Sequence, residues 1–375
     1  MRYAATIAGL ILALAMAIWW WGRGSEVAAG HVAAAPSRWS PPLTPATSPT
    51  LAKTATRGAW TQSEQDLAWC QLPGEWTSDR EPSDAELERV KAALAASDVQ
   101  SRAETERVHA LWREQLRTQG DGQSQAAADL LDPDAAAKRH LFDLARNTQD
   151  PVVYGWAMAA CLKQGPCELS ARRWIQLDPG NLAAWLAEAQ QAQQRGDVQA
   201  VREALYQIGL AQRNDDYGRR LMSMEYAMAQ ADRPGLQMAT EILQPLSDLI
   251  ALRIQGVELI RYCSAAGVKS DPSRQGSCVA AGDSLWRQAD DPWQAQLALA
   301  WARHSAPQDE AVWAQRKAEL DLLQAKALKL SDRAFGGFHR DGNFCSGLLE
   351  ARPYFTAAAA IGQLAALRQA VVERE

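Results

Sequence analysis

The sequence lacks most of the patterns that mark an enzyme or a nucleic-acid-binding protein. None of its five histidines lies in a His-Glu-x-x-His pattern, which excludes that class of zinc protease on motif grounds. It contains no Gly-x-Ser-x-Gly nucleophile elbow and no glycine-rich phosphate-binding loop ending in Gly-Lys-Ser or Gly-Lys-Thr. Lysine and arginine do not cluster, and the net charge is −5, so the basic face that nucleic acids require is missing. We therefore expect no enzyme activity, no cofactor, no metal site and no nucleic-acid partner.

Signals for β-strands are also scarce, whereas signals for helices are frequent. No run alternates β-branched with aromatic residues, and no Asn-Gly hairpin turn occurs. Apolar residues make up 47% of the 375 residues, and fifteen tryptophans add to the area that a core can bury. Residues 61–375 predict an all-α domain, an irregular stack of antiparallel helical hairpins, whose first helix starts at a capping box of Ser83 and Glu86. Later helices are expected at 101–118, 135–147, 152–163, 167–176, 181–195, 198–211, 216–230, 236–263, 276–289, 293–304, 309–330 and 350–372.

Residues 1–22 predict a transmembrane anchor. Residues 3–21 carry no charge, and as a helix this stretch is about 28 Å long, close to the thickness of the hydrocarbon core of a bilayer. Three consecutive tryptophans at its end suit the membrane–water interface and make a poor cleavage site. The alternative is a signal peptide, whose cleavage would release the chain into the periplasm.

Two further features accompany the anchor. Residues 23–60 are rich in Pro, Ala, Ser and Thr, a composition that blocks regular helix and strand and predicts a disordered linker spanning about 35 Å. Small residues also recur at every fourth position of the anchor and therefore lie on one face of its helix. Two membrane helices can approach closely through such a face, which makes it a candidate dimerisation surface. These residues are Ala5, Gly9, Ala13 and Ala17.

The six cysteines indicate an oxidising compartment. They form three candidate disulfide pairs: Cys161 with Cys167, Cys263 with Cys278, and, by elimination, Cys70 with Cys345. The first two pairs would each join neighbouring helix ends, although six cysteines allow 15 arrangements in all. Disulfides favour a single-pass protein of the inner membrane whose C-terminal domain is periplasmic. The alternatives are six reduced core cysteines, or a metal site that includes His339, for which the cysteine spacing is wrong.

Residues 331–347 are unusually rich in glycine and phenylalanine and interrupt two expected helices. A loop of this composition is a candidate binding surface. The alternative is a closure loop whose aromatic side chains cover the end of the helical stack. His109 and His140 lie on expected helices, and we expect them to have a structural or surface role. The candidate binding residues are Phe335, Phe338, His339, Arg340, Asp341 and Phe344.

Residues 178–211 resemble one tetratricopeptide repeat, a pair of antiparallel helices of about 34 residues. The matching residues are Pro179, Trp185, Ala189, Gly196, Asp197, Val201 and Leu205. Glu188, Ala192 and Arg213 depart from the pattern, and Trp156 lies 29 rather than 34 residues before Trp185, so the units do not form a regular array. The resemblance implies a degenerate, tetratricopeptide-like superhelix.

The stretch "YGWAMAACLKQGPCELSARRWIQLDPGNLAAW" is similar to an uncharacterised group of membrane-anchored, helical bacterial envelope proteins. This second resemblance implies a location and a fold, and no activity. Together, these features favour a membrane-anchored periplasmic scaffold or adaptor that binds an envelope protein or peptide. The alternative is an envelope enzyme whose active site lies near residues 331–347.

Overall fold

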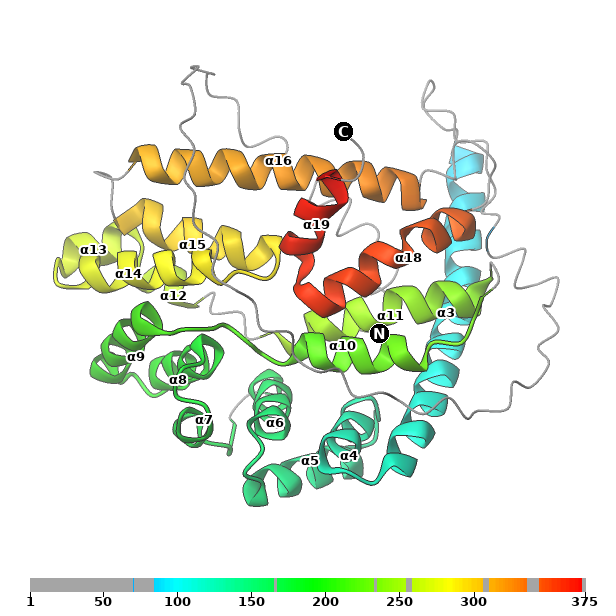
Figure 1. The fold of residues 1–375 in the computed structure, drawn as a ribbon, viewed down its shortest axis with the longest axis horizontal. Helices are drawn as coiled ribbons and strands as arrows, with labels where there is room; N and C mark the ends of the chain where they lie inside the picture. Colours follow the sequence, from blue (N-terminus) through cyan, green and yellow to red (C-terminus); the bar gives the residue numbers. More distant parts are fainter. Residues whose placement is uncertain are drawn as a thin grey trace. The chain divides into compact units, whose positions relative to one another are not determined.

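The fold is seen in a computed structural model of the chain. The structure describes Cys70 and residues 84–164, 167–232, 235–253, 258–305, 310–335 and 344–372. Among these residues all regular secondary structure is helical, and the predicted all-α class is confirmed (Figure 1). Outside the helices, the described residues include an isolated parallel β-bridge between Asn181 and Arg213.

The chain divides into two units. One consists of Met1–Ser63 and Arg80–Ala103, and its described part is the beginning of the first helix. The other consists of Glu64–Asp79 and Glu104–Glu375, and all the contacts discussed below lie within it. Its helices are α3 (Asp84–Gln119, from Glu104 onward), α4 (Gly122–Leu130), α5 (Ala135–Asn147), α6 (Pro151–Lys163), α7 (Ala171–Leu177), α8 (Leu182–Gln194), α9 (Val198–Leu210), α10 (Gly218–Met228), α11 (Leu236–Leu252), α12 (Glu258–Tyr262), α13 (Ala265–Ser270), α14 (Arg274–Arg287), α15 (Pro292–Ser305), α16 (Glu310–Phe335), α18 (Phe344–Ile361) and α19 (Gln363–Val372).

Two of the expected helices are in fact divided, and these predictions were wrong. The helix expected over 236–263 ends at Leu252, because Arg253 takes an extended conformation with φ −64° and ψ 132°, and α12 is a separate helix. The helix expected over 350–372 is interrupted at Gly362, whose φ of 89° lies outside the helical region. The sequence patterns also gave no indication of α4 and α13.

Several helices begin at an acidic or amide side chain that accepts a hydrogen bond from the first turn. Asp150, for example, accepts from the N–H of Val152 at 2.8 Å, and Pro151 occupies the following position, where a missing N–H costs nothing. Side chains also cap the first turns of α4, α5, α8 and α9 by accepting a backbone N–H. These side chains are Asp121, Asp134, Asn181 and Asp197.

The turn of the α8–α9 hairpin lies where the sequence predicts it. Gly196 adopts a φ of 72°, and its N–H bonds to the carbonyl of Gln193 at 3.0 Å. The N–H of Asp197 bonds to the carbonyl of Ala192 at 2.9 Å, which completes the paired hydrogen bonds of a Schellman motif. The side chain of Asp197 then accepts from the N–H of Ala200 at 3.0 Å and starts α9.

A buried polar network joins the two ends of this hairpin. The amide of Asn181 donates to the carbonyl of Asp215 at 2.7 Å and accepts from the N–H of Asp215 at 3.0 Å. Asp178 accepts from Asn181, Arg213 and Tyr217. Arg213, which departs from the repeat pattern, therefore closes the hairpin with its side chain.

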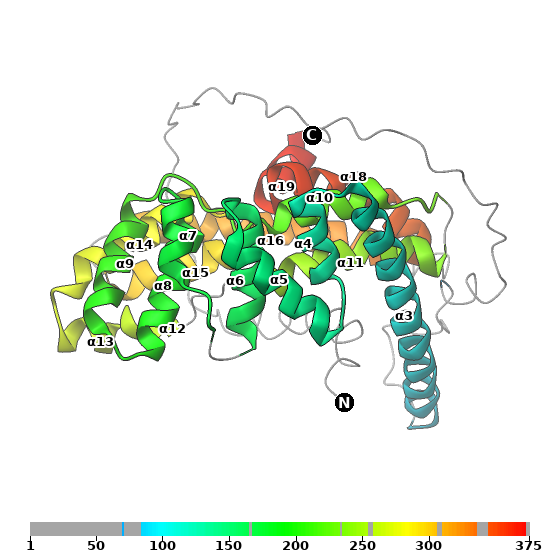
Figure 2. The same ribbon diagram turned by 90° about the horizontal axis from the view of Figure 1, so that it is seen from below.

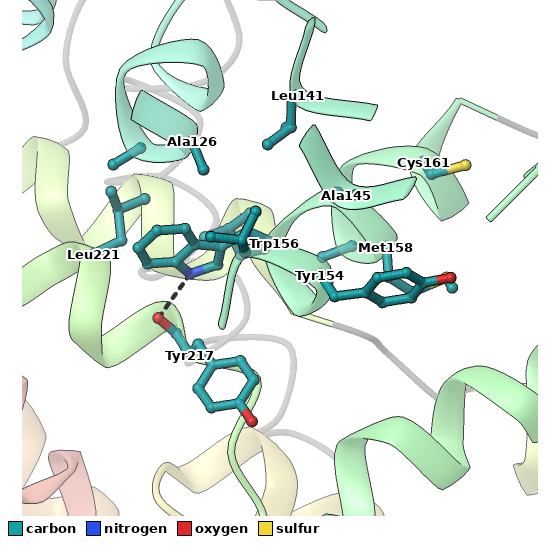
Figure 3. Packing of buried hydrophobic residues seen from close by; sticks show 14 of the residues in the cluster. Ala126, Leu141, Ala145, Tyr154, Trp156, Met158, Cys161, Tyr217 and Leu221 are labelled. Carbon is teal, nitrogen blue, oxygen red and sulfur yellow. Dashed lines mark hydrogen bonds between the residues drawn. The ribbon is translucent and has the colours of Figure 1, made fainter. Parts of the chain in front are cut away.

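The first hydrophobic core is formed mainly by α3, α4, α5, α6, α7, α8 and α10, around the fully buried ring of Trp156 (Figure 3). The indole N–H of Trp156 donates to the carbonyl of Tyr217 at 2.9 Å, so its one polar atom is satisfied. Trp112 and Trp174 are also fully or almost fully buried in this core. Alanines fill the space between these large side chains, which explains how an alanine-rich sequence still buries a sizeable core.

A second core joins two helical hairpins. The hairpin α8–α9 packs against α14–α15 through contacts between α9 and α14, and Figures 1 and 2 show α9 beside α14. Leu205 and Ile208 of α9 are buried there together with Cys278 of α14 and Trp301 of α15. Further apolar clusters join α10 and α11 to α18, and α15 and α16 to α19. Within this unit, these apolar clusters bury the apolar faces of neighbouring helices against one another.

In the described part of the chain, no helix combines the length and the apolar character that crossing a membrane would require. The predicted anchor, its row of small residues, the linker and the capping box of Ser83 lie outside the described residues.

Candidate functional site

Three titratable side chains from three helices converge at one place in the fold. They are His109 of α3, Glu225 of α10 and Asp248 of α11, and one nitrogen or oxygen atom from each lies within 4.8 Å of the others. His109 Nε2 is 3.0 Å from Asp248 Oδ2. The two carboxylates and the imidazole therefore form a compact cluster of potential metal ligands.

Glu225 lies on the buried face of its helix. Leu221 and Met222 lie four and three residues before Glu225, Met228 lies three residues after it, and all four are buried. The side chain of Glu225 is completely inaccessible to solvent, and neither of its carboxylate oxygens has a hydrogen-bond donor. Burying a carboxylate in this way is costly unless something compensates its charge.

Other buried carboxylates of the described residues show how this compensation is usually achieved. Glu241 accepts hydrogen bonds from the N–H groups of Gln230 and Ala231, each at 2.7 Å, and from the side chain of Gln237 at 2.7 Å. The remaining ones are Asp129 with His140, Asp178 with Arg213, Glu188 with Arg172 and Arg195, and Asp291 with Arg253. Glu225 is the exception among the described buried carboxylates.

The environment of Glu225 favours its neutral form in the absence of a cation. Burial raises the pKa of Glu225 well above its ordinary value, and the negative charge of Asp248 and a hydrogen bond between the two carboxyl groups act in the same direction. No described Lys or Arg forms an ion pair with it. Two arrangements can satisfy the pair: one proton shared between Glu225 and Asp248, or a cation bound between them.

The neighbours of the cluster hold its ligands in place. Gln244, one turn before Asp248 on α11, donates to Asp248 Oδ1 at 2.9 Å and leaves Oδ2 to face His109. The ring of Trp112 lies 5.9 Å from the ring of His109, centroid to centroid. The side chains of His109 and Asp248 are 12% and 16% exposed, so the cluster is buried at Glu225 and reaches solvent at the other two residues.

Sequence reasoning did not find this cluster. His109 was expected to have a structural or surface role, and its partners lie 116 and 139 residues further along the chain. The available signal was Glu225, a carboxylate at a position of α10 where the helical spacing predicts an apolar residue. The same role was expected for His140, whose Nδ1 lies 2.7 Å from Asp129 Oδ2. Among the described residues, this pair does not belong to a group of three potential metal ligands.

The structure brings together the three cysteine pairs that the sequence suggested. The Cα atoms are 5.3 Å apart in Cys70–Cys345, 5.2 Å apart in Cys161–Cys167 and 5.6 Å apart in Cys263–Cys278, and each pair forms a disulfide. The first disulfide lies in the core between α11 and α18, where both sulfur-bearing residues are fully buried.

The binding loop predicted over residues 331–347 is only partly described, and the prediction was wrong at both of its ends, since residues 331–335 belong to α16 and residues 344–347 to α18. Phe335 is the last residue of α16 and Phe344 is the first residue of α18. Phe338, His339, Arg340 and Asp341 lie outside the described residues, and so does the binding surface predicted from them.

Two small cavities occur beside the cores, and neither has the size of a ligand pocket. Each measures about 10 Å³, which is enough for about one water molecule. Asp216, Arg253 and Gln294 line both of them. Because ligand pockets are commonly hundreds of cubic ångströms in size, these cavities do not indicate a small-molecule site.

No protein-family model matches the chain, and neither a curated protein nor a solved structure shows significant similarity to it.

Proposed function

We propose that the chain is a membrane-anchored periplasmic scaffold or adaptor that binds an envelope protein or peptide through its tetratricopeptide-like helical hairpins. An irregular stack of such hairpins presents outward helix faces to a partner while its inward faces form the core. The packing of α8–α9 against α14–α15 supports this reading of the fold.

A row of exposed apolar side chains on α9 is the observation that carries the proposal. Val198, Tyr206 and Leu210 are 49%, 54% and 59% exposed. Together with Arg202 they lie four residues apart, and residues at this spacing form one ridge along a helix. The opposite side of α9 is buried in the second core, so this ridge faces away from the core of its own hairpin stack. An apolar ridge of this kind suits helix-to-protein contact.

Two features support the location. The uncharged stretch at 3–21 has the length and the flanking tryptophans of a membrane anchor. The three disulfides fit an oxidising compartment such as the periplasm, since disulfides rarely persist in the cytosol.

Site-directed photo-crosslinking in cells tests the proposal. A photo-reactive phenylalanine analogue replaces Tyr206 in the full-length chain, and the matched control carries it at Leu322 of α16, which is 57% exposed but lies on another helix. We expect a discrete crosslinked envelope protein from position 206 that is missing at position 322. Equal crosslinking at both positions, or none at either, would overturn the role of this ridge.

A pair of charge substitutions then tests whether the ridge provides affinity. The double variant Tyr206→Glu, Leu210→Glu keeps helix-compatible residues at exposed positions, so its thermal stability is expected to stay within a few degrees of the wild type. We expect it to lose co-purification of the partner identified by crosslinking, whereas Leu322→Glu retains it. Unchanged co-purification by the double variant would contradict the proposed surface.

A further inference from the structure

We propose that His109, Glu225 and Asp248 bind a divalent transition-metal ion, with Zn²⁺ the best-matched probe. The three side chains supply one imidazole nitrogen and two carboxylate oxygens, donors that Zn²⁺ accepts in three-ligand sites that keep water as a fourth ligand. This inference is independent of the adaptor role, because the cluster and the ridge on α9 share no residue.

The spacing of the donor atoms fits such an ion. Ligands at 2.0–2.1 Å from a tetrahedral zinc are separated from one another by about 3.3–3.4 Å. His109 Nε2 and Asp248 Oδ2 are 3.0 Å apart, and all three donor atoms lie within 4.8 Å of one another. Shifts of an ångström or so in side-chain positions would therefore complete the site without moving the helices.

The buried carboxylate of Glu225, whose oxygens accept from no donor, is the second observation that points to a bound cation. Glu225 is fully buried and both of its oxygens lack a donor, whereas the other buried carboxylates of the described residues all have partners. With a neutral imidazole, two ionised carboxylates give the cluster a charge of −2, which a divalent cation neutralises.

The surroundings select the kind of ion and leave it accessible. Ca²⁺ and Mg²⁺ take six or more ligands that are nearly all oxygen, a set that this cluster with one nitrogen does not provide. The Gln244 side chain fixes the orientation of Asp248 through Oδ1, as outer partners of metal ligands commonly do. The partial exposure of His109 and Asp248 gives the ion and its water a route from solvent.

The test measures Zn²⁺ binding to the full-length, detergent-solubilised chain with its disulfides intact, after removal of metals by a chelator. Isothermal titration and elemental analysis after dialysis give affinity and stoichiometry, and thermal unfolding is followed with Zn²⁺, Ca²⁺ or no metal. We expect one Zn²⁺ per chain at high affinity, a higher melting temperature with Zn²⁺, and no comparable shift with Ca²⁺.

Variants separate this site from incidental binding at the surface. His109→Gln and Glu225→Gln are each expected to weaken Zn²⁺ binding by at least about 100-fold, and Gln244→Ala by about 10-fold. His140→Gln is the matched control, because His140 also pairs with an aspartate but lacks the third ligand. Its affinity and stoichiometry are expected to equal those of the wild type.

Three results would overturn the proposal. The first is a wild-type chain that binds no more Zn²⁺ than His109→Gln, and the second is an equal loss of binding in His140→Gln. The third is a stability gain in Glu225→Gln with no zinc effect in the wild type, which would leave a shared proton as the whole explanation of the cluster. His109→Gln changes a residue at the partly exposed end of the cluster, so it remains informative if Glu225→Gln does not fold.

Discussion

At the residue scale, the buried carboxylates differ in whether hydrogen-bond donors surround them. Glu241 is surrounded by donors, whereas Glu225 has none and faces a second carboxylate. A hydrogen bond to a charged group contributes about 1.5–3 kcal/mol, and removing one partner leaves the others unsatisfied. The two glutamates are therefore expected to respond in opposite directions to the same substitution.

In metal-free protein, Glu241→Gln is expected to lower the free energy of unfolding by about 1.5–3 kcal/mol, because an amide replaces the acceptor of three hydrogen bonds. Glu225→Gln is expected to leave it unchanged or to raise it, because the amide N–H₂ can donate to Asp248 and one buried acid is removed. Urea unfolding in the presence of a chelator measures both values. A Glu225→Gln variant that is as destabilised as Glu241→Gln would show that an unseen donor already satisfies Glu225.

Asp290 gives the protein a pH-dependent contribution to stability. Burial raises the pKa of Asp290 to about 6, and the charges of Asp216, Asp215 and Asp291 act in the same direction, against the opposing effect of Arg219. Since the ordinary pKa is 3.8, the folded state holds this proton more tightly than the unfolded state. The resulting stability is fully present below about pH 4 and is lost as the pH rises through about 6.

Asp290→Asn is therefore expected to lose less unfolding free energy than the wild type between pH 5 and pH 7, because its amide does not titrate. Urea unfolding at half-unit pH steps measures the difference between the two curves. Asp143→Asn is the control for the loss of an aspartate at the surface, since that side chain is 64% exposed. Parallel curves for Asp290→Asn and the wild type would contradict the assignment.

At the scale of the element, the sequence predicts helices well where a local signal marks their ends. Asp150-Pro151 and Gly196-Asp197 are such signals, because capping and left-handed turns depend on a few neighbouring residues. The breaks after Leu252 and at Gly362 were missed because apolar spacing continues across them. At Gly362 the break accompanies a tertiary contact, since the N–H of Leu364 donates to the carbonyl of Asp290 at 2.9 Å.

The hairpin turn at Gly196 can be tested against a second exposed glycine. Gly196→Ala is expected to cost about 1–2 kcal/mol, because a φ of 72° is unfavourable for a residue with a Cβ even though no atom lies within 4 Å of its position. Gly276→Ala in α14 also meets nothing within 4 Å but has helical geometry, and it is expected to gain up to about 1 kcal/mol. Thermal or urea unfolding of both variants measures the contrast, and a cost of the same size at both positions would contradict the role given to the positive φ of Gly196.

At the scale of the whole molecule, the candidate site shows what a single sequence cannot predict. His109, Glu225 and Asp248 meet only because α10 and α11 pack beside each other and reach α3, and no spacing along the chain encodes that meeting. The cysteine pairs were easier to predict, because two of the three pairs are close in the sequence and leave a single pairing for the remaining two cysteines. The third pair is separated by 275 residues in the sequence, and it was predicted only by elimination.

The same difference in span predicts how much each disulfide stabilises the folded chain. In the chain-entropy model, closing loops of 6, 15 and 275 residues contributes roughly 2, 3 and 5.5 kcal/mol, so double substitution to Ala is expected to destabilise most at Cys70–Cys345 and least at Cys161–Cys167. Urea unfolding of the three double variants, with the oxidised wild type as reference, gives the order. The Cys70–Cys345 disulfide closes a loop that contains most of the helices that form the cores. Its loss therefore removes a constraint on most of the unfolded chain. If its removal costs no more than removal of Cys161–Cys167, the packing around that disulfide, rather than the closure of the long loop, holds the two segments together.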